Sequence, residues 1–169
     1  MKKILFLGVI LAFYLIIGDL SKNKNIIPKE AIRIRILANS NSSSDQKKKQ
    51  QVKDSVESYL YSLLESAHTV EEAEEIISTN INKLEQIVKD NFKGDFKIDF
   101  GLNYFPKKIY KGIIYDEGYY NSLVVSLGEA VGDNWWCILY PPLCMLDDNS
   151  LSDVEYRSLV GDIISQYFN

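Results

Sequence analysis

Apolar and polar residues alternate strictly in the first patterned segment of the chain. In residues 31–38 (AIRIRILA), three isoleucines fall on one face, and Arg33 and Arg35 fall on the other. This period of two predicts a β-strand whose arginine face meets solvent or a partner. The polar run over residues 39–44 (NSNSSS) predicts a loop after the strand.

The spacing then becomes helical. Apolar residues recur every three or four positions between Asp45 and Ser66, which predicts an amphipathic helix. A capping box at Thr69–Glu72 predicts the start of a second helix, whose apolar stripe continues to Val88. Because the linker between the two helices is short, we expect them to be antiparallel neighbours.

Alternation returns in the second half of the chain and is clearest over residues 96–104. Three further strand candidates follow, at 109–115, 123–127 and 135–140. Because the connections between these strands are short, we expect antiparallel pairing. A second capping box at Ser152 predicts a last helix, which runs to about Tyr167.

The predicted order is β-α-α-β-β-β-β-α. Segregation of helices from strands predicts an α+β fold, a two-layer domain with helices packed on one face of a mostly antiparallel sheet. A length of 169 residues, 46% of them hydrophobic, suits a single folded domain, which we expect to span residues 30–169.

The N-terminal segment has the pattern of an export signal. Lys2 and Lys3 precede residues 4–18, which carry no charge, and Asp19 ends the run. The run is short for a membrane span, yet no clear cleavage site follows it. We therefore predict either a cleaved signal peptide or an uncleaved anchor in residues 1–19, followed by a polar spacer over residues 20–29. In both cases the domain lies outside the cytoplasm.

The charge distribution argues against a nucleic-acid partner. The net charge is −4, and because residues 1–28 contribute +3, the remainder carries −7. Sequence-independent DNA binding relies on Lys and Arg side chains that neutralise phosphates. The basic cluster Lys47–Lys49 is typical of a solvated helix face.

The sequence lacks the patterns expected of an enzyme. Its single histidine, His68, stands beside a helix cap, and the usual nucleophile, metal and phosphate-binding motifs are absent. Two cysteines and one distant histidine do not complete a structural zinc site. We therefore predict no catalytic residue, no metal and no cofactor.

Cys137 and Cys144 leave three interpretations open. Cysteines in an exported chain are expected to pair, and Pro141 and Pro142 between them end a strand and help to turn the chain. The two residues can otherwise be free buried thiols. The third interpretation is a redox-active pair, although such enzymes usually separate their cysteines by two residues.

Trp135 and Trp136 point to opposite faces if their segment is a strand. One then enters the core, and the other is available to a partner, since Trp is enriched among the residues that dominate binding energies. The alternative is that both are buried, one under the helices and one under a loop.

Two segments resemble the stage II sporulation protein R family of endospore-forming bacteria. The first holds Ala-Asn-Ser at 38–40 and Asp45-Gln46, and the second holds Gly128-Glu129, Asn-Trp-Trp-Cys at 134–137 and Pro-Pro-Leu-Cys at 141–144. Ala130 departs from the family pattern, which has a glycine there. The resemblance spans residues 31–147.

The resemblance implies a signalling protein that is made in the forespore and exported across the forespore membrane. In the intermembrane space, secreted or anchored through residues 4–18 to the cytoplasmic membrane, it would activate a membrane-embedded aspartic protease in the opposing membrane. That protease then processes pro-sigma-E. The activation would act through protein-protein contact.

The residues predicted to meet the partner are Asn39, Ser40, Asn134, Trp135, Trp136, Pro141 and Pro142, framed by the disulfide candidates Cys137 and Cys144. An alternative function is an extracytoplasmic thiol-disulfide oxidoreductase that uses the two cysteines. A third is a small-molecule binding module, which would need a deep apolar pocket.

Overall fold

The structure, a computed structural model, describes residues 27–146 and 151–168. Its elements follow in the order β1 (Ile32–Leu37), α2 (Ser43–Leu64), α3 (Val70–Thr79), α4 (Ile81–Asn91), β2 (Phe96–Phe105), β3 (Lys108–Tyr110), β4 (Ile113–Tyr115), β5 (Gly118–Leu127), β6 (Asn134–Tyr140), the 3-10 helix η1 (Leu143–Leu146) and α5 (Asp153–Phe168). The predicted α+β class is confirmed. The predicted export segment lies outside the described residues.

A four-stranded sheet of order β2-β5-β1-β6 forms the centre of the domain. β2 pairs with β5, and β1 with β6, in antiparallel register, whereas β1 and β5 run parallel. The sheet is therefore mostly antiparallel, as predicted. The parallel pair arises because β1, the first strand of the described residues, inserts between β5 and β6. Local sequence patterns do not record such a long-range pairing.

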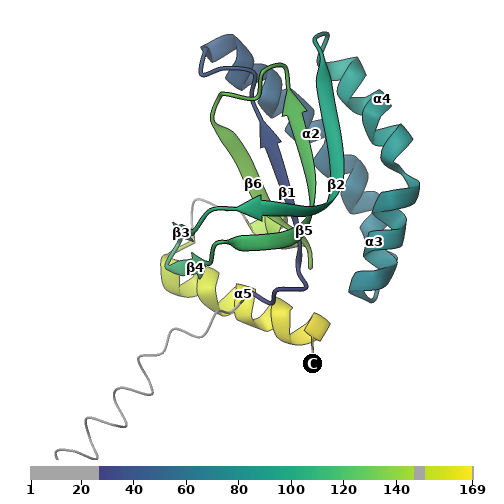
Figure 1. The fold of residues 1–169 in the computed structure, drawn as a ribbon. Coiled ribbons are helices and arrows are strands. Elements are labelled where there is room, and N and C mark those ends of the chain that lie inside the picture. Colours follow the sequence, from purple (N-terminus) through teal and green to yellow (C-terminus); the bar gives the residue numbers. More distant parts are fainter. Residues whose placement is uncertain (1–26, 147–150, 169) are drawn as a thin grey trace, which may run out of the picture.

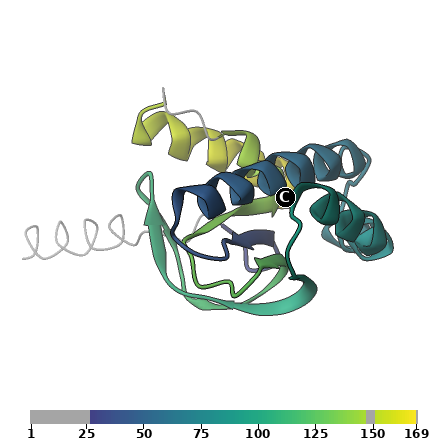
Figure 2. The same ribbon diagram turned by 90° about the horizontal axis from the view of Figure 1, so that it is seen from above.

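Helices α2, α3 and α4 pack against one face of the sheet (Figures 1 and 2). The isoleucines of β1, Ile32 to Ile36, are buried there together with Val52, Val56 and Leu60 of α2. Each such aliphatic side chain contributes about 1.5–3 kcal/mol when it leaves water. This main core fixes which side chains of the neighbouring strand β6 face the helices.

The second predicted helix is divided at Asn80 into α3 and α4. Asn80 adopts φ −107° and ψ 11°, and its side-chain amide donates to the Ile76 carbonyl at 2.8 Å. Its side-chain oxygen accepts from the Tyr59 hydroxyl of α2 at 2.7 Å. A polar side chain that bonds to a nearby carbonyl competes with the helical backbone, and apolar spacing does not reveal such a break.

The paired ends of β2 and β5, residues 102–105 and 118–121, bend across the second face of the sheet (Figure 1). Arg33 is 2% exposed beneath this bend, with its guanidinium carbon 3.3 Å from the ring centroid of Tyr120. The guanidinium carbon of Arg35 lies 4.9 Å from the ring centroid of Phe105. The prediction of a solvent-facing arginine face is therefore wrong, because both arginines stack against aromatic rings of the same chain.

α5 lies at the lower end of the sheet in Figure 1, apart from the other helices. Its buried residues Tyr156 and Val160 join a second, smaller core. The segment predicted as one strand over 109–115 is instead the hairpin β3–β4, which turns at Lys111 and Gly112 with φ of 45° and 73°. The hairpin and α5 together enclose the space beside β6.

Candidate functional site

A cavity of about 160 Å³ lies beside β6 and is lined by five consecutive residues of that strand, 134–138. The other walls come from α2, the hairpin, η1 and α5, through Lys53, Lys108, Tyr110, Tyr115, Leu143, Cys144 and Tyr156. We call this cavity and its lining the β6 groove. It brings together five residues of the predicted site: Asn134, Trp135, Trp136, Cys137 and Cys144.

Trp135 and Trp136 form different walls of the β6 groove. Trp135 packs against the main core, and the Nζ atom of Lys53 lies 5.2 Å from its ring centroid. Trp136 belongs to the smaller core, where its ring meets the Tyr115 ring edge-on with 4.7 Å between centroids. Both tryptophans are half-buried. Each ring is therefore partly packed and partly open. This differs both from one buried and one exposed tryptophan and from two buried tryptophans, the two alternatives given by the sequence.

Lys53 and Lys108 bring positive charge to the β6 groove. Desolvation would lower the pKa of Lys53, but its hydrogen bond and ion pair with Glu57, at 2.6 Å, raise the pKa above the usual value. The Nζ atom of Lys108 lies 5.0 Å from the ring centroid of Trp136, and desolvation lowers its pKa. Sequence reasoning assigned neither lysine to the site. For Lys108 nothing in the local pattern distinguishes it from its neighbour Lys107.

Cys137 and Cys144 are joined by a disulfide, with their Cα atoms 5.5 Å apart. This bond disagrees with free buried thiols, and it fits both a structural disulfide and the oxidised form of a redox-active pair. Cys144 is 6% exposed and Cys137 is half-buried. A loop this short contributes about 2–3 kcal/mol through the restricted entropy of the unfolded chain. The bond ties β6 to η1 at the groove.

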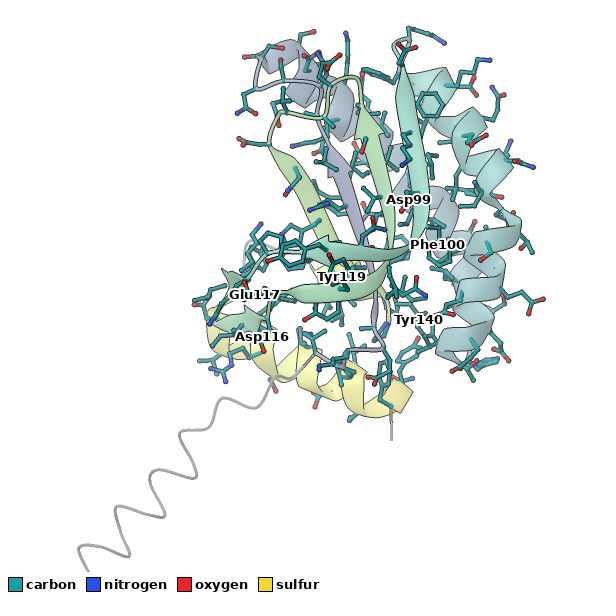
Figure 3. The ribbon with its side chains drawn as sticks, viewed as in Figure 1. Asp99, Phe100, Asp116, Glu117, Tyr119 and Tyr140 are labelled. Carbon is teal, nitrogen blue, oxygen red and sulfur yellow. A yellow bond between two sulfur atoms is a disulfide. The ribbon has the colours of Figure 1, made fainter. Side chains whose placement is uncertain are left out.

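Pro141 and Pro142 follow β6 and lie outside the lining of the groove. Pro141 is buried, Pro142 is half-buried, and the Tyr140–Pro141 peptide bond is cis. The Tyr140 hydroxyl donates to the Ala67 carbonyl at 3.3 Å, which fixes the end of β6 against the linker after α2 (Figure 3). The two prolines therefore end the strand and lead into η1, and they add no surface to the groove.

Asn39 and Ser40 lie near the start of β6 and are held by hydrogen bonds within the chain. The Asn39 amide donates to the Asp45 carboxylate at 2.8 Å, and its oxygen accepts from the Glu129 backbone N–H at 3.0 Å. The Ser40 hydroxyl donates to the same carboxylate at 2.6 Å. These bonds, that of Ser40 first, lower the pKa of Asp45. They join the loop after β1 to the loop before β6.

Further contacts close the same two loops. Lys49 of α2 is buried and donates from Nζ to the Asp133 carbonyl at 3.0 Å. Gly132 lies so close to Ser40 that a Cβ atom would collide with the Ser40 carbonyl oxygen. We call residues 39–46 and 128–133, with Lys49, the loop clamp. Because it ends where β6 begins, the clamp sets the position of Asn134 and Trp135.

Other candidate chemistry is sparse in the described part of the chain. His68 is exposed in the linker between α2 and α3. Within residues 27–146 and 151–168, no three or more His, Cys, Asp and Glu side chains are grouped in a way that could hold a metal ion. None of the helices in these ranges is long and apolar enough to cross a membrane.

The loop clamp and the β6 strand both fall within a match to a known family. The family model described as Stage II sporulation protein R matches residues 28–150. The chain belongs to this family. It is also 36% identical over 127 residues to Stage II sporulation protein R of Bacillus subtilis (strain 168), an alignment that covers 72% of this chain and 57% of that protein. No solved structure matches the chain.

The family match extends from residue 28 to residue 150, so that α5 and its groove residue Tyr156 lie beyond it. Within the match, Ala130 stands where the family resemblance predicts a glycine. Its φ is 54°, in the left-handed region that favours glycine. The backbone of the loop clamp therefore keeps a conformation suited to glycine although the side chain differs.

Proposed function

We propose that this chain is an exported intercellular messenger of sporulation, which activates a membrane-embedded aspartic protease in the opposing membrane by direct contact and so leads to processing of pro-sigma-E. Membership of the family supports a role in sporulation signalling. The observation that carries the contact is the β6 groove, with its two half-buried tryptophans. Tryptophan is a residue type on which binding energy concentrates at interfaces.

The proposal assigns different roles to the predicted site residues. Asn134, Trp135 and Trp136 meet the partner, because they line the β6 groove. Asn39 and Ser40 act indirectly, because their hydrogen bonds hold the loop clamp. The disulfide and the two prolines hold the other end of β6. A strand fixed at both ends loses little conformational freedom on binding, which favours affinity.

The proposed place of action is the space between the two membranes. The N-terminal pattern of two lysines and an uncharged run supports export across the forespore membrane. The domain then acts after release, or while residues 4–18 anchor it. Neither form needs a cofactor, since contact alone activates the protease.

Co-expression tests the proposal. The candidate protease and pro-sigma-E are produced with and without this chain, and cleavage is expected only when the chain is present. Trp135→Ala and Trp136→Ala should lower cleavage by about tenfold or more in folded protein, because each removes an aromatic contact. Tyr119→Ala serves as the control, since Tyr119 is an aromatic residue that is 71% exposed outside the groove. Cleavage without the chain, or full activity of both folded Trp variants, would overturn the proposal.

The alternative, a thiol-disulfide oxidoreductase, has one structural observation in its favour: both cysteines line the groove. Purified protein assayed for disulfide reduction separates the two functions. Turnover that disappears in the folded double variant Cys137→Ser and Cys144→Ser would favour the enzyme. A chain that supports pro-sigma-E cleavage without such turnover would favour the messenger.

A further inference from the structure

The lining of the β6 groove contains an unusual run of residues. Alternate side chains of a strand point to opposite faces of the sheet, so a pocket on one face is lined by every second residue. Residues 134–138 are consecutive, and all five line the groove. Trp135 packs into the main core and Trp136 into the smaller one, so the lining includes side chains from both faces. The groove therefore follows the backbone edge of β6.

That edge is the free edge of the sheet. β6 is the terminal strand, with β1 as its neighbour. Beyond its ladder with β1, no backbone–backbone hydrogen bond of residues 134–138 is found within the described ranges, and the Ile138 carbonyl oxygen lies 2.9 Å from the Cys144 sulfur. In an antiparallel pair, alternate N–H and C=O groups point away from the partner strand. The groove thus presents a row of backbone donors and acceptors without a strand beside them.

We propose that the β6 groove binds an extended, acidic segment of the partner protein, which adds to the four-stranded sheet as a further strand beside β6. The inference rests on the proposed function and names how the partner is held at the same site. In strand addition, backbone hydrogen bonds supply affinity and the walls beside the edge supply specificity. Residues 134–138 give room for a segment of about five residues at strand spacing.

The charge of the groove selects an acidic segment. The charged side chains in the lining are both lysines, Lys53 and Lys108, although residues 29–169 carry a net charge of −7. Lys53 is already paired with Glu57 at 2.6 Å. Lys108 forms no ion pair with any residue in the described ranges and stands over the Trp136 ring. Desolvation lowers the pKa of Lys108 and so disfavours its charged form. A carboxylate of the incoming segment would stabilise that charged form.

The other edge of the sheet is less suited to the same occupant. The cavity near β2 includes only one residue of that strand, Phe96. β2 also bends across the second face, so its edge does not continue straight along the sheet (Figure 2). A strand adds along a run of backbone groups, and the β6 groove supplies such a run between two tryptophan walls.

Peptide binding tests the proposal directly. The probes are overlapping synthetic peptides that cover the segments of the candidate protease facing the intermembrane space. The two tryptophans of the chain, Trp135 and Trp136, both line the groove, so fluorescence excited selectively at tryptophan, with probe peptides that lack tryptophan, reports on the groove. We expect an acidic peptide to bind, and replacement of its Asp and Glu by Asn and Gln to weaken binding about tenfold. Lys108→Glu should weaken binding similarly, whereas the neighbouring control Lys107→Glu should leave it unchanged.

N-methylation of the peptide tests the backbone contact. Each variant peptide carries one N-methyl group, moved along the sequence. Only alternate N–H groups of an added strand donate to β6, so methylation should abolish binding at every second position of the paired segment. A peptide that tolerates methylation throughout binds through its side chains, and this result would overturn strand addition.

The outcomes separate this inference from the proposed function. If no peptide changes the fluorescence while co-expression still gives pro-sigma-E cleavage, the strand-addition inference is wrong and the messenger function stands. If the peptides bind with the alternating methylation pattern but cleavage does not depend on the chain, the groove stands and the messenger function is wrong. A third outcome is that the chain forms a dimer in sedimentation equilibrium and that its tryptophan fluorescence changes as the dimer forms. This result would assign the edge to a second copy of the chain and would overturn the inference.

Discussion

The guanidinium carbon of Arg33 lies 3.3 Å from the ring centroid of Tyr120, so a ring from the bent part of β5 covers a cation of β1. The Nε atom of Arg33 has no hydrogen-bond partner among the described residues. Burial of an incompletely paired charge contributes little net stability, whereas the ring contributes a large apolar surface. The bend of β2 and β5 is therefore held mainly by aromatic packing, and Arg33 occupies the space beneath the rings.

Two substitutions at this contact should have unequal effects. Tyr120→Ala should lower the free energy of unfolding by about 3 kcal/mol or more, because it removes a buried ring and uncovers Arg33. Arg33→Met, which keeps the volume and removes the charge, should change it by less than about 1.5 kcal/mol in either direction. Urea unfolding measures both, with the exposed neighbour variant Tyr119→Ala as the control. A larger loss for Arg33→Met than for Tyr120→Ala would mean that the charge holds the bend.

Asp45 should make the stability of the loop clamp depend on pH in the acid range. Its carboxylate accepts hydrogen bonds from Ser40 and Asn39, which lower its pKa. In the unfolded chain the pKa of an aspartate is about 3.9, so the folded protein binds this proton less readily. The stability that the carboxylate provides is therefore complete above about pH 5 and is lost as the pH falls through the lowered folded pKa.

We predict that the free energy of unfolding falls more steeply below about pH 4 in the wild type than in Asp45→Asn, which has no group to titrate at this position. Ser40→Ala and Asn39→Ala should each reduce the slope in part, because each removes one donor to the carboxylate. Urea unfolding over a series of acid pH values gives the slopes. Equal slopes in the wild type and Asp45→Asn would show that the hydrogen bonds do not stabilise the charged form.

Gly128 and Ala130 offer a matched pair in the same loop. Their φ values are 56° and 54°, both in the left-handed region, where a residue with a Cβ atom is disfavoured by about 1–2 kcal/mol. Ala130→Gly should therefore raise the free energy of unfolding, by up to about 1 kcal/mol after the entropy of glycine is counted. Gly128→Ala should lower it, since the new Cβ atom would also collide with the Asn39 side chain. Thermal unfolding measures both, and a loss of stability in Ala130→Gly would contradict the prediction.

Local sequence patterns predicted the positions of strands, but they did not predict side-chain environments that depend on distant parts of the chain. Alternation located β1 and β2, and the strand predicted at 135–140 placed Trp135 and Trp136 on opposite faces. It could not place Arg33 in the interior, because the cover comes from a bend of β2 and β5 more than sixty residues away. For the same reason it could not find Lys108, which reaches the groove only because the β3–β4 hairpin packs beside β6.

The different roles proposed for the motif residues could be assigned only from the folded structure. Asn39 and Ser40 share the family pattern with the tryptophans, yet they reach Asp45 and Glu129 and do not line the groove. A motif records which residues are used together and does not separate those that contact a partner from those that position them. Here the hydrogen bonds show that Asn39 and Ser40 hold two loops together, which is the basis for the positioning role proposed for them.

The disulfide should matter more for the stability of the domain than for its contact surface. Cys137→Ser with Cys144→Ser should lower the free energy of unfolding by about 2–3 kcal/mol, because the loop between them is no longer closed in the unfolded chain. The tryptophans and lysines of the groove remain, so pro-sigma-E cleavage by the folded double variant should fall less than in Trp136→Ala. Urea unfolding and the co-expression assay measure the two effects separately. Complete loss of cleavage in a double variant that stays folded would mean that the cysteines themselves take part in the function, as the oxidoreductase alternative requires.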